Sequence, residues 1–217
     1  MSNFAENIGF LFDLDGVLID SENEYTRIWA QINREYPTGI ENFETKIKGC
    51  TLTKILTENY SEEVRPLVSK RLHELEALMR YNFLPNAREF LELAQEMLIP
   101  CALVTSSDVV KMNHLYEELP DLSNFFDIII TGSQVKTSKP SPEGYLLAAA
   151  SIERNPRNCA VFEDSLQGVM AGKNAGAYVV GVAGTLPEDQ LSPFSDTIIN
   201  RFAELDCDLL IQKLNDR

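Results

Sequence analysis

The hydrophobic positions of this chain fall into short continuous runs that alternate with amphipathic stretches. Each run is apolar at successive residues, a pattern typical of parallel strands that are covered on both faces. The runs predicted to form strands are Ile8–Phe12, Cys101–Val104, Asp127–Ile130 and Cys159–Phe162, then Tyr178–Val182 and Thr197–Ile199. The stretches with helical spacing between them include Asn86–Leu98, Pro142–Ala150 and Leu166–Ala175. This alternation predicts a doubly wound, Rossmann-like parallel sheet of the α/β class.

Residues 20–82 interrupt that alternation with helical spacing throughout. Ser21 and Glu24 have the spacing of a capping box, and Ser61–Tyr81 shows a second amphipathic helical pattern. We therefore predict a small all-helical cap domain over residues 20–82, inserted after the first strand. Residues 1–19 and 83–217 would form the α/β core domain, with linkers near Leu18–Asp20 and Asn82–Pro85.

Composition narrows the possible partners and the cellular location. The 217 residues are 44% apolar, and 33 acidic against 19 basic residues give a formal net charge of −14. A surface of that sign disfavours nucleic acid and anionic membranes, because both are bound by neutralising their phosphates. No signal-peptide pattern and no apolar run of about 20 residues is present. Four widely spaced cysteines favour a reducing environment, so we expect a cytoplasmic protein.

Polar groups follow four of the predicted strands at the points where these strands end. Each group alone has an ordinary explanation, such as helix capping, a turn or a solvated side chain. Adjacent carboxylates repel one another, however, and are normally kept together by a cation or a shared proton. The carboxyl ends of parallel strands meet at one crevice, where ligands bind. In chain order the groups are Asp13 and Asp15, then Thr105 and Ser106, then Lys139, and finally Glu163 and Asp164.

Four motifs around these groups resemble the haloacid dehalogenase superfamily. They are FDLDGVLIDSE at 12–22, VTSS at 104–107, SKPSPEGY at 138–145 and VFEDSLQGVMAGKNAGA at 161–177. The order of the motifs, with a helical insert after the first, is similar to the β-phosphoglucomutase-like branch of that superfamily. The resemblance implies a hydrolase that acts on a small phosphorylated metabolite, and it implies the same fold as the hydrophobic pattern does.

The resemblance also implies a role for each of these residues. Asp13 would be the nucleophile that becomes an aspartyl phosphate, and Asp15 the general acid and then the general base. Phosphate oxygens would be held by Thr105, the Ser106 amide and Lys139. A Mg²⁺ ion would be bound by the Asp13 carboxylate, the Asp15 backbone carbonyl and Asp164, with Glu163 assisting.

Electrostatics agrees with a magnesium requirement. Two like unit charges about 4 Å apart repel by about 4 kcal/mol at an effective dielectric of about 20. Four carboxylates facing a phosphate dianion therefore need compensation, which Mg²⁺ and Lys139 would supply. An oxygen-rich site that shares a phosphate suits Mg²⁺ better than zinc.

Residues of the helical insert bear on whether water or a second substrate hydroxyl accepts the phosphoryl group. Related mutases have a histidine and an arginine where this chain has Tyr25 and Leu52. We therefore expect a phosphatase, with a β-phosphoglucomutase-type mutase as the alternative. Tyr25 and Trp29 are predicted to be packing residues of the cap. Lys48 is a candidate substrate contact, with a solvated lysine at a helix end as the alternative.

Two non-enzymatic alternatives are a receiver-like phospho-switch and a catalytically inactive binding relative. Receiver domains share the strand-end aspartates and the lysine, but they lack a helical insert after the first strand. Every catalytic position of the superfamily is filled here, which argues against an inactive relative.

Overall fold

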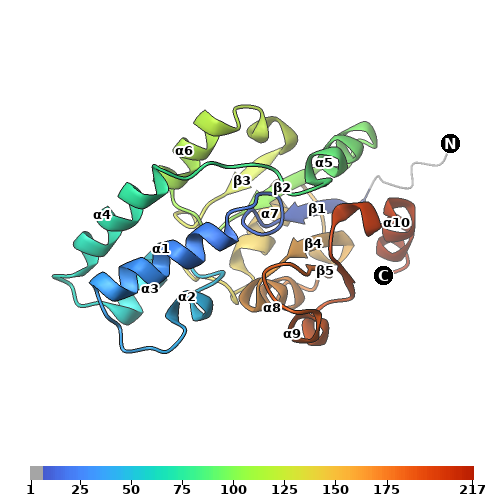
Figure 1. Cartoon of the computed structure of the whole chain (residues 1–217). Coiled ribbons are helices and arrows are strands. Elements are labelled where there is room, and N and C mark those ends of the chain that lie inside the picture. The colour runs from blue at the N-terminus through green and yellow to red at the C-terminus, as the bar shows by residue number, and fades with distance from the viewer. Residues whose placement is uncertain (1–6) are drawn as a thin grey trace.

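The computed structural model describes residues 7–217, apart from the side chain of Glu22, and it contains one six-stranded parallel sheet (Figure 1). The strand order is β3-β2-β1-β4-β5-β6, and each neighbouring pair is parallel. The chain thus runs outward from β1 to β3 and then returns to the other side of β1, which makes the carboxyl ends of β1 and β4 the switch point of the sheet. The strands are β1 Gly9–Phe12, β2 Cys101–Val104, β3 Ile128–Ile130, β4 Cys159–Glu163, β5 Tyr178–Val182 and β6 Thr197–Ile199.

Both faces of the sheet are covered by helices, as the continuous apolar strands require. On one face, Leu11 packs with residues of α7 and α8. On the other, Phe12 and Phe162 stack with ring centroids 4.5 Å apart, and Phe90 of α5 joins the same aromatic cluster. The core helices are α5 Ala87–Glu96, α6 Val109–Glu118, α7 Glu143–Ser151, α8 Leu166–Asn174, α9 Glu188–Leu191 and α10 Cys207–Asn215.

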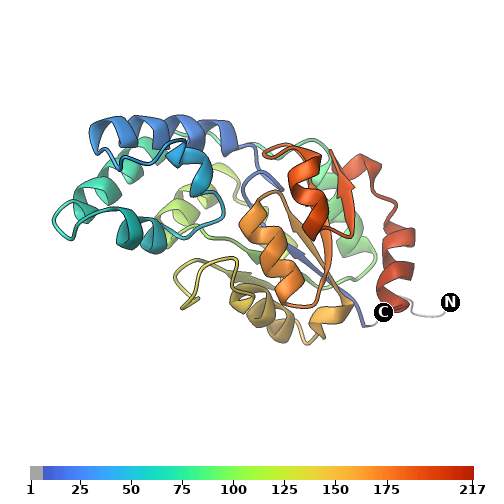
Figure 2. The same cartoon turned by 90° about the horizontal axis from the view of Figure 1, so that it is seen from below.

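The four helices between β1 and α5, here called the cap helices, lie together to one side of the sheet (Figures 1 and 2). They are α1 Glu22–Glu35, α2 Phe43–Lys46, α3 Leu52–Asn59 and α4 Arg65–Glu76. The two chain segments that lead into and out of them run side by side. Asp20 N–H donates to the Asn82 carbonyl at 3.0 Å, and Leu84 N–H donates to the Leu18 carbonyl at 2.8 Å. The division into two domains at residues 20 and 82 stays a prediction, which limited proteolysis would test.

Most predicted elements are present with end shifts of one or two residues, but two expectations at the cap helices were wrong. The Ser21 hydroxyl makes no capping hydrogen bond to α1; it donates to Asp15 Oδ1 instead. Glu24 pairs with Arg27 on the surface. The helix predicted over Ser61–Tyr81 is shorter, because regular α-helix is confined to Arg65–Glu76. Within residues 7–217, no helix is both long and apolar enough to cross a membrane.

Candidate active site

A buried ion-paired cluster lies at the ends of β1 and β4. The Asp13 N–H donates to the Phe162 carbonyl at 3.0 Å, which holds the residue beside β4. Lys139 Nζ lies 2.6 Å from Asp13 Oδ1 and 2.6 Å from Glu163 Oε1. Carboxylate oxygens of Asp13, Glu163 and Asp164 all lie within 4.8 Å of one another, and all three residues are buried. The topology of the sheet thus unites the predicted groups from the first, third and fourth motifs.

Glu163 is fully buried and has partners for both oxygens. Besides Lys139, Tyr145 OH donates to its Oε1 at 2.6 Å, and Ser165 Oγ donates to its Oε2 at 3.2 Å. Ser165 also caps α8, because its side chain accepts the Gly168 N–H at 3.0 Å. Gly168 leaves the space that the Glu163 carboxylate occupies, since a Cβ there would lie 1.8 Å from Glu163 Cδ.

Replacing Gly168 by Ala is therefore expected to destabilise the protein, although alanine normally favours a helix by about 1 kcal/mol. The added methyl group would displace the Glu163 carboxylate and disturb its bonds to Lys139 and Tyr145, with an expected loss of about 1–3 kcal/mol. Chemical denaturation of the variant measures this loss. Gly184→Ala is the matched control, because a Cβ at Gly184 meets no atom within 4 Å. A Gly168→Ala protein as stable as the wild type would contradict the assigned packing.

Burial and charge shift the pKa values of the two central groups. Burial raises the pKa of Asp13 to about 8. The positive charge of Lys139 acts in the opposite direction, and the negative charge of Glu163 adds to the increase. Burial alone would lower the pKa of Lys139, but the charges of Asp13 and Glu163 outweigh it, so this pKa lies above its usual value. The lysine is therefore held as an ammonium, while a proton on Asp13 is retained to unusually high pH in the absence of a further cation.

Asp15 is held by three side chains at the edge of the cluster. Ser21 donates to Oδ1, whereas Ser107 Oγ lies 3.2 Å and Lys111 Nζ 2.5 Å from Oδ2. Lys111 is buried, and its Nζ also lies 4.2 Å from the centre of the Tyr25 ring. Sequence reasoning missed Lys111. Its one local signal was its place in the first turn of the helix that Asp108 caps.

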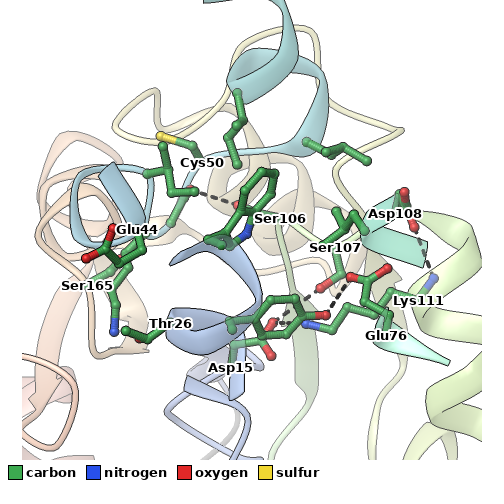
Figure 3. A pocket seen from close by; sticks show the side chains of 18 of the residues that line it. Asp15, Thr26, Glu44, Cys50, Glu76, Ser106, Ser107, Asp108, Lys111 and Ser165 are labelled. Carbon is green, nitrogen blue, oxygen red and sulfur yellow. Dashed lines mark hydrogen bonds and ion pairs between the residues drawn. The ribbon is translucent and has the colours of Figure 1, made fainter. Parts of the chain in front are cut away.

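A cavity of about 110 Å³ separates the cap helices from this cluster (Figure 3). Asp13, Asp15, Ser106 and Asp164 line it from the core. The predicted substrate contact Lys48 lines it from the cap side, as do Tyr25, Trp29 and Leu52. Tyr25 and Trp29, expected only to pack the cap, therefore also form part of the cavity wall.

All three predicted phosphate-binding residues line a second, smaller space. Thr105 and Lys139 border a smaller space of about 20 Å³, to which Ser106 also contributes. Thr105 Oγ1 accepts the Ser107 N–H at 3.0 Å, so its hydroxyl shapes the turn after β2. Ser106 Oγ donates to the Gly49 carbonyl at 2.8 Å and thereby joins this turn to the cap helices.

The donor set of the cluster fits a magnesium ion. It contains carboxylate oxygens only, which are the hard ligands that Mg²⁺ prefers. Gly16, with φ +72°, makes room for one of them, because a Cβ there would lie 1.8 Å from Asp164 Oδ2. Three buried carboxylates are balanced within the cluster by one lysine, so an added dication would offset their repulsion.

These features define the class of protein: an enzyme with a doubly wound sheet, whose candidate catalytic carboxylates lie at the switch point beneath helices inserted after β1. The family profile of the haloacid dehalogenase-like hydrolases matches residues 9–176. The chain therefore belongs to the haloacid dehalogenase-like hydrolase family.

Individual relatives agree with this membership. The chain is 34% identical over 189 residues to a phosphorylated carbohydrates phosphatase of Thermotoga maritima, covering 81% of this chain and 85% of that protein. It is 33% identical over 181 residues to hexitol phosphatase A of Escherichia coli, covering 80% and 82%. A putative β-phosphoglucomutase structure from Bacteroides vulgatus has a TM-score of 0.81 at 23% identity and covers 98% of this chain and 92% of its own; it shows the shared fold. Membership in this family rules out the receiver-like alternative.

Proposed function

We propose that this protein is a magnesium-dependent phosphatase that hydrolyses a small phosphomonoester, such as a sugar phosphate or polyol phosphate, through an aspartyl phosphate on Asp13. One observation carries the proposal: carboxylate oxygens of Asp13, Glu163 and Asp164 lie within 4.8 Å of one another, Lys139 bonds to two of these residues, and Asp13 and Asp164 line the cavity. The names of the two phosphatase relatives support the substrate class.

The proposed reaction has two steps. Asp13 attacks phosphorus, an Asp13 oxygen–phosphorus bond forms, and the ester bond breaks while Asp15 gives a proton to the leaving alkoxide. In the second step Asp15 takes a proton from water, the water oxygen bonds to phosphorus, and the bond to Asp13 breaks to release phosphate. Lys139 and the Thr105–Ser106 turn are proposed to hold phosphate oxygens throughout.

The proposed ligands of Mg²⁺ are the Asp13 and Asp164 carboxylates and the Asp15 backbone carbonyl. Glu163 would assist by holding Lys139, because both of its oxygens already accept hydrogen bonds. When bound, the ion supplies two positive charges that offset these carboxylates and the phosphoryl oxygens.

Tyr25 and Leu52 support hydrolysis over mutase chemistry. Tyr25 OH donates to Glu76 Oε1 at 2.7 Å, and burial together with the charge of Glu76 raises the pKa of this phenol well above its usual value. Neither residue supplies a base or a cation to the cavity. A mutase would need such a group to position a sugar hydroxyl that accepts the phosphoryl group from Asp13.

The direct test is a phosphate-release screen over sugar phosphates, polyol phosphates and nucleotides with Mg²⁺. We expect release from at least one small phosphomonoester and none after chelation of the metal. Conversion of β-glucose 1-phosphate to glucose 6-phosphate faster than its hydrolysis would favour the mutase alternative.

Magnesium affinity is expected to depend on pH because a proton on Asp13 competes with the ion. With the pKa of Asp13 raised to about 8, the metal-free site is largely protonated below that pH. The apparent dissociation constant should therefore rise about tenfold for each unit of pH below about 8 and level off above it. Calorimetric titration between pH 6 and pH 9 measures this dependence. An affinity that is constant over this range would contradict the prediction, and Asp13→Asn should remove most of the slope.

A further inference from the structure

Glu76, the last residue of α4, places a buried carboxylate in the wall of the cavity. Its side chain is 7% exposed. Oε1 accepts the Tyr25 hydroxyl at 2.7 Å, but Oε2 has no hydrogen-bond partner among the described residues. His73 Nε2 lies 4.0 Å from Oε2 and is hydrogen-bonded to Asp108 Oδ2 at 3.0 Å.

The donors around Glu76 are engaged elsewhere. Figure 3 shows Glu76 and Lys111 beside one another, with the Lys111 side chain extending to Asp15. The Lys111 ammonium lies 2.5 Å from Asp15 Oδ2 and over the Tyr25 ring. A buried acceptor without a donor is unfavourable, so a ligand that supplies a donor here is favoured over one that does not.

The charges lining the cavity limit what that ligand can be. Two lysines, Lys48 and Lys111, face six carboxylates, and Lys111 is already paired with Asp15. A cleft lined mostly by one sign of charge repels ligands of the same sign. The phosphoryl group meets Lys139 and the proposed metal, but the far end of the leaving group meets the acidic wall. The six carboxylates are Asp13, Asp15, Glu44, Glu76, Asp108 and Asp164.

Part of the remaining wall of the cavity is apolar. Trp29, Ile55 and Leu72 line it from α1, α3 and α4. Such a surface suits the C–H faces of a carbohydrate or polyol. The leaving group that fits these walls is therefore uncharged, hydroxyl-bearing and partly apolar.

We propose that Glu76 is a specificity residue whose carboxylate accepts a hydrogen bond from a hydroxyl of the leaving group, and that the cavity rejects phosphomonoesters with a second negative charge. The inference rests on the proposed phosphatase function and names the substrate class within it: phosphates of neutral sugars or polyols.

Two substrates that differ at one end test this inference. Sorbitol 6-phosphate ends in a hydroxymethyl group where 6-phosphogluconate has a carboxylate. We expect the wild-type kcat/KM to be about 100-fold higher for sorbitol 6-phosphate. Glu76→Gln, which keeps an acceptor for Tyr25 but removes the charge, should reduce that ratio about tenfold. Glu62→Gln is the matched control, because it removes the same charge from an exposed position outside the cavity and should leave the ratio unchanged.

The possible outcomes distinguish a failure of the Glu76 proposal from a failure of the phosphatase proposal. Equal hydrolysis of both substrates, or an unchanged ratio in a Glu76→Gln protein that unfolds at the wild-type temperature, would overturn the role of Glu76. If phosphate release from every substrate were the same after Asp13→Asn, the phosphatase proposal itself would fail. A selective loss of activity on sorbitol 6-phosphate in Glu76→Gln, with 6-phosphogluconate unchanged or improved, would support hydroxyl recognition.

Discussion

Replacing Asp13 by Asn is expected to lower phosphate release by a factor on the order of 10⁴ or more while leaving the fold intact. The amide cannot form the aspartyl phosphate, but it has the same shape and retains an oxygen to accept the bond from Lys139, which lies 2.6 Å from Asp13 Oδ1. Phosphate release under saturating Mg²⁺ measures the loss, and acid quenching followed by detection of phosphoprotein shows whether the covalent intermediate disappears.

The matched control for this loss is Asp189→Asn, which removes a carboxylate from an exposed position on α9. It should retain wild-type activity, and both variants should unfold near the wild-type temperature. Equal phosphate release by Asp13→Asn and wild type would show that Asp13 is not the nucleophile.

The second large effect is expected at Lys139. Its side chain is 8% exposed, and Nζ lies 2.6 Å from both Asp13 and the fully buried Glu163. Lys139→Ala would leave these carboxylates without their cation, and removal of one partner of a buried ion pair costs about 3–5 kcal/mol of stability. Activity should fall by a factor on the order of 10³, because a donor to the phosphoryl oxygens is also lost. Chemical denaturation and phosphate release measure the two losses.

Two further variants serve as controls for the effects of Lys139→Ala. Lys136→Ala removes an exposed lysine from the same loop and should change neither property. The double variant Lys139→Met, Glu163→Gln removes the charges of both Lys139 and Glu163 and should recover much of the stability but not the activity. A Lys139→Ala protein of wild-type stability would contradict the ion-pair geometry, whereas recovery of activity in the double variant would contradict the phosphate-binding role.

One side of the site is formed by the ends of the β-strands, and the other side is formed by the cap helices. Asp13 and Glu163 stand at the ends of buried strands, so the sheet itself sets their separation. The opposite wall depends on how the cap helices sit, which is held in part by Ser106 Oγ to Gly49 and by Thr51 N–H to Ser138 Oγ at 2.9 Å. The candidate catalytic carboxylates and the opposite wall of the cavity thus come from separate parts of the chain.

The sequence motifs located the candidate catalytic groups because each motif is local. Asp13, Thr105, Lys139 and Asp164 each follow a strand whose apolar run is visible in the sequence. Parallel pairing then brings the ends of those strands to one edge of the sheet, so the topology rule alone predicts that these groups meet.

The failed capping prediction and the two missed residues both involve partners that the local sequence pattern does not reveal. Ser21 has the local sequence of a helix cap, yet its hydroxyl binds Asp15 because the turn after β1 brings that charged acceptor within reach, and charge-assisted hydrogen bonds are stronger than neutral ones. Lys111 contacts a carboxylate 96 positions away, and Glu76 contacts a phenol 51 positions away. Sequence spacing carries no signal for such pairs.

By itself, the sequence determined the α/β class, the helical insert and the identity of the candidate catalytic groups, because strand burial and strand-end chemistry are properties of short segments. The tertiary structure alone decided the partners of Asp15, the position of Glu76 and the combination of acidic and apolar residues that lines the cavity. Those features depend on how the cap helices lie against the core, and that packing is settled by contacts between residues far apart along the chain.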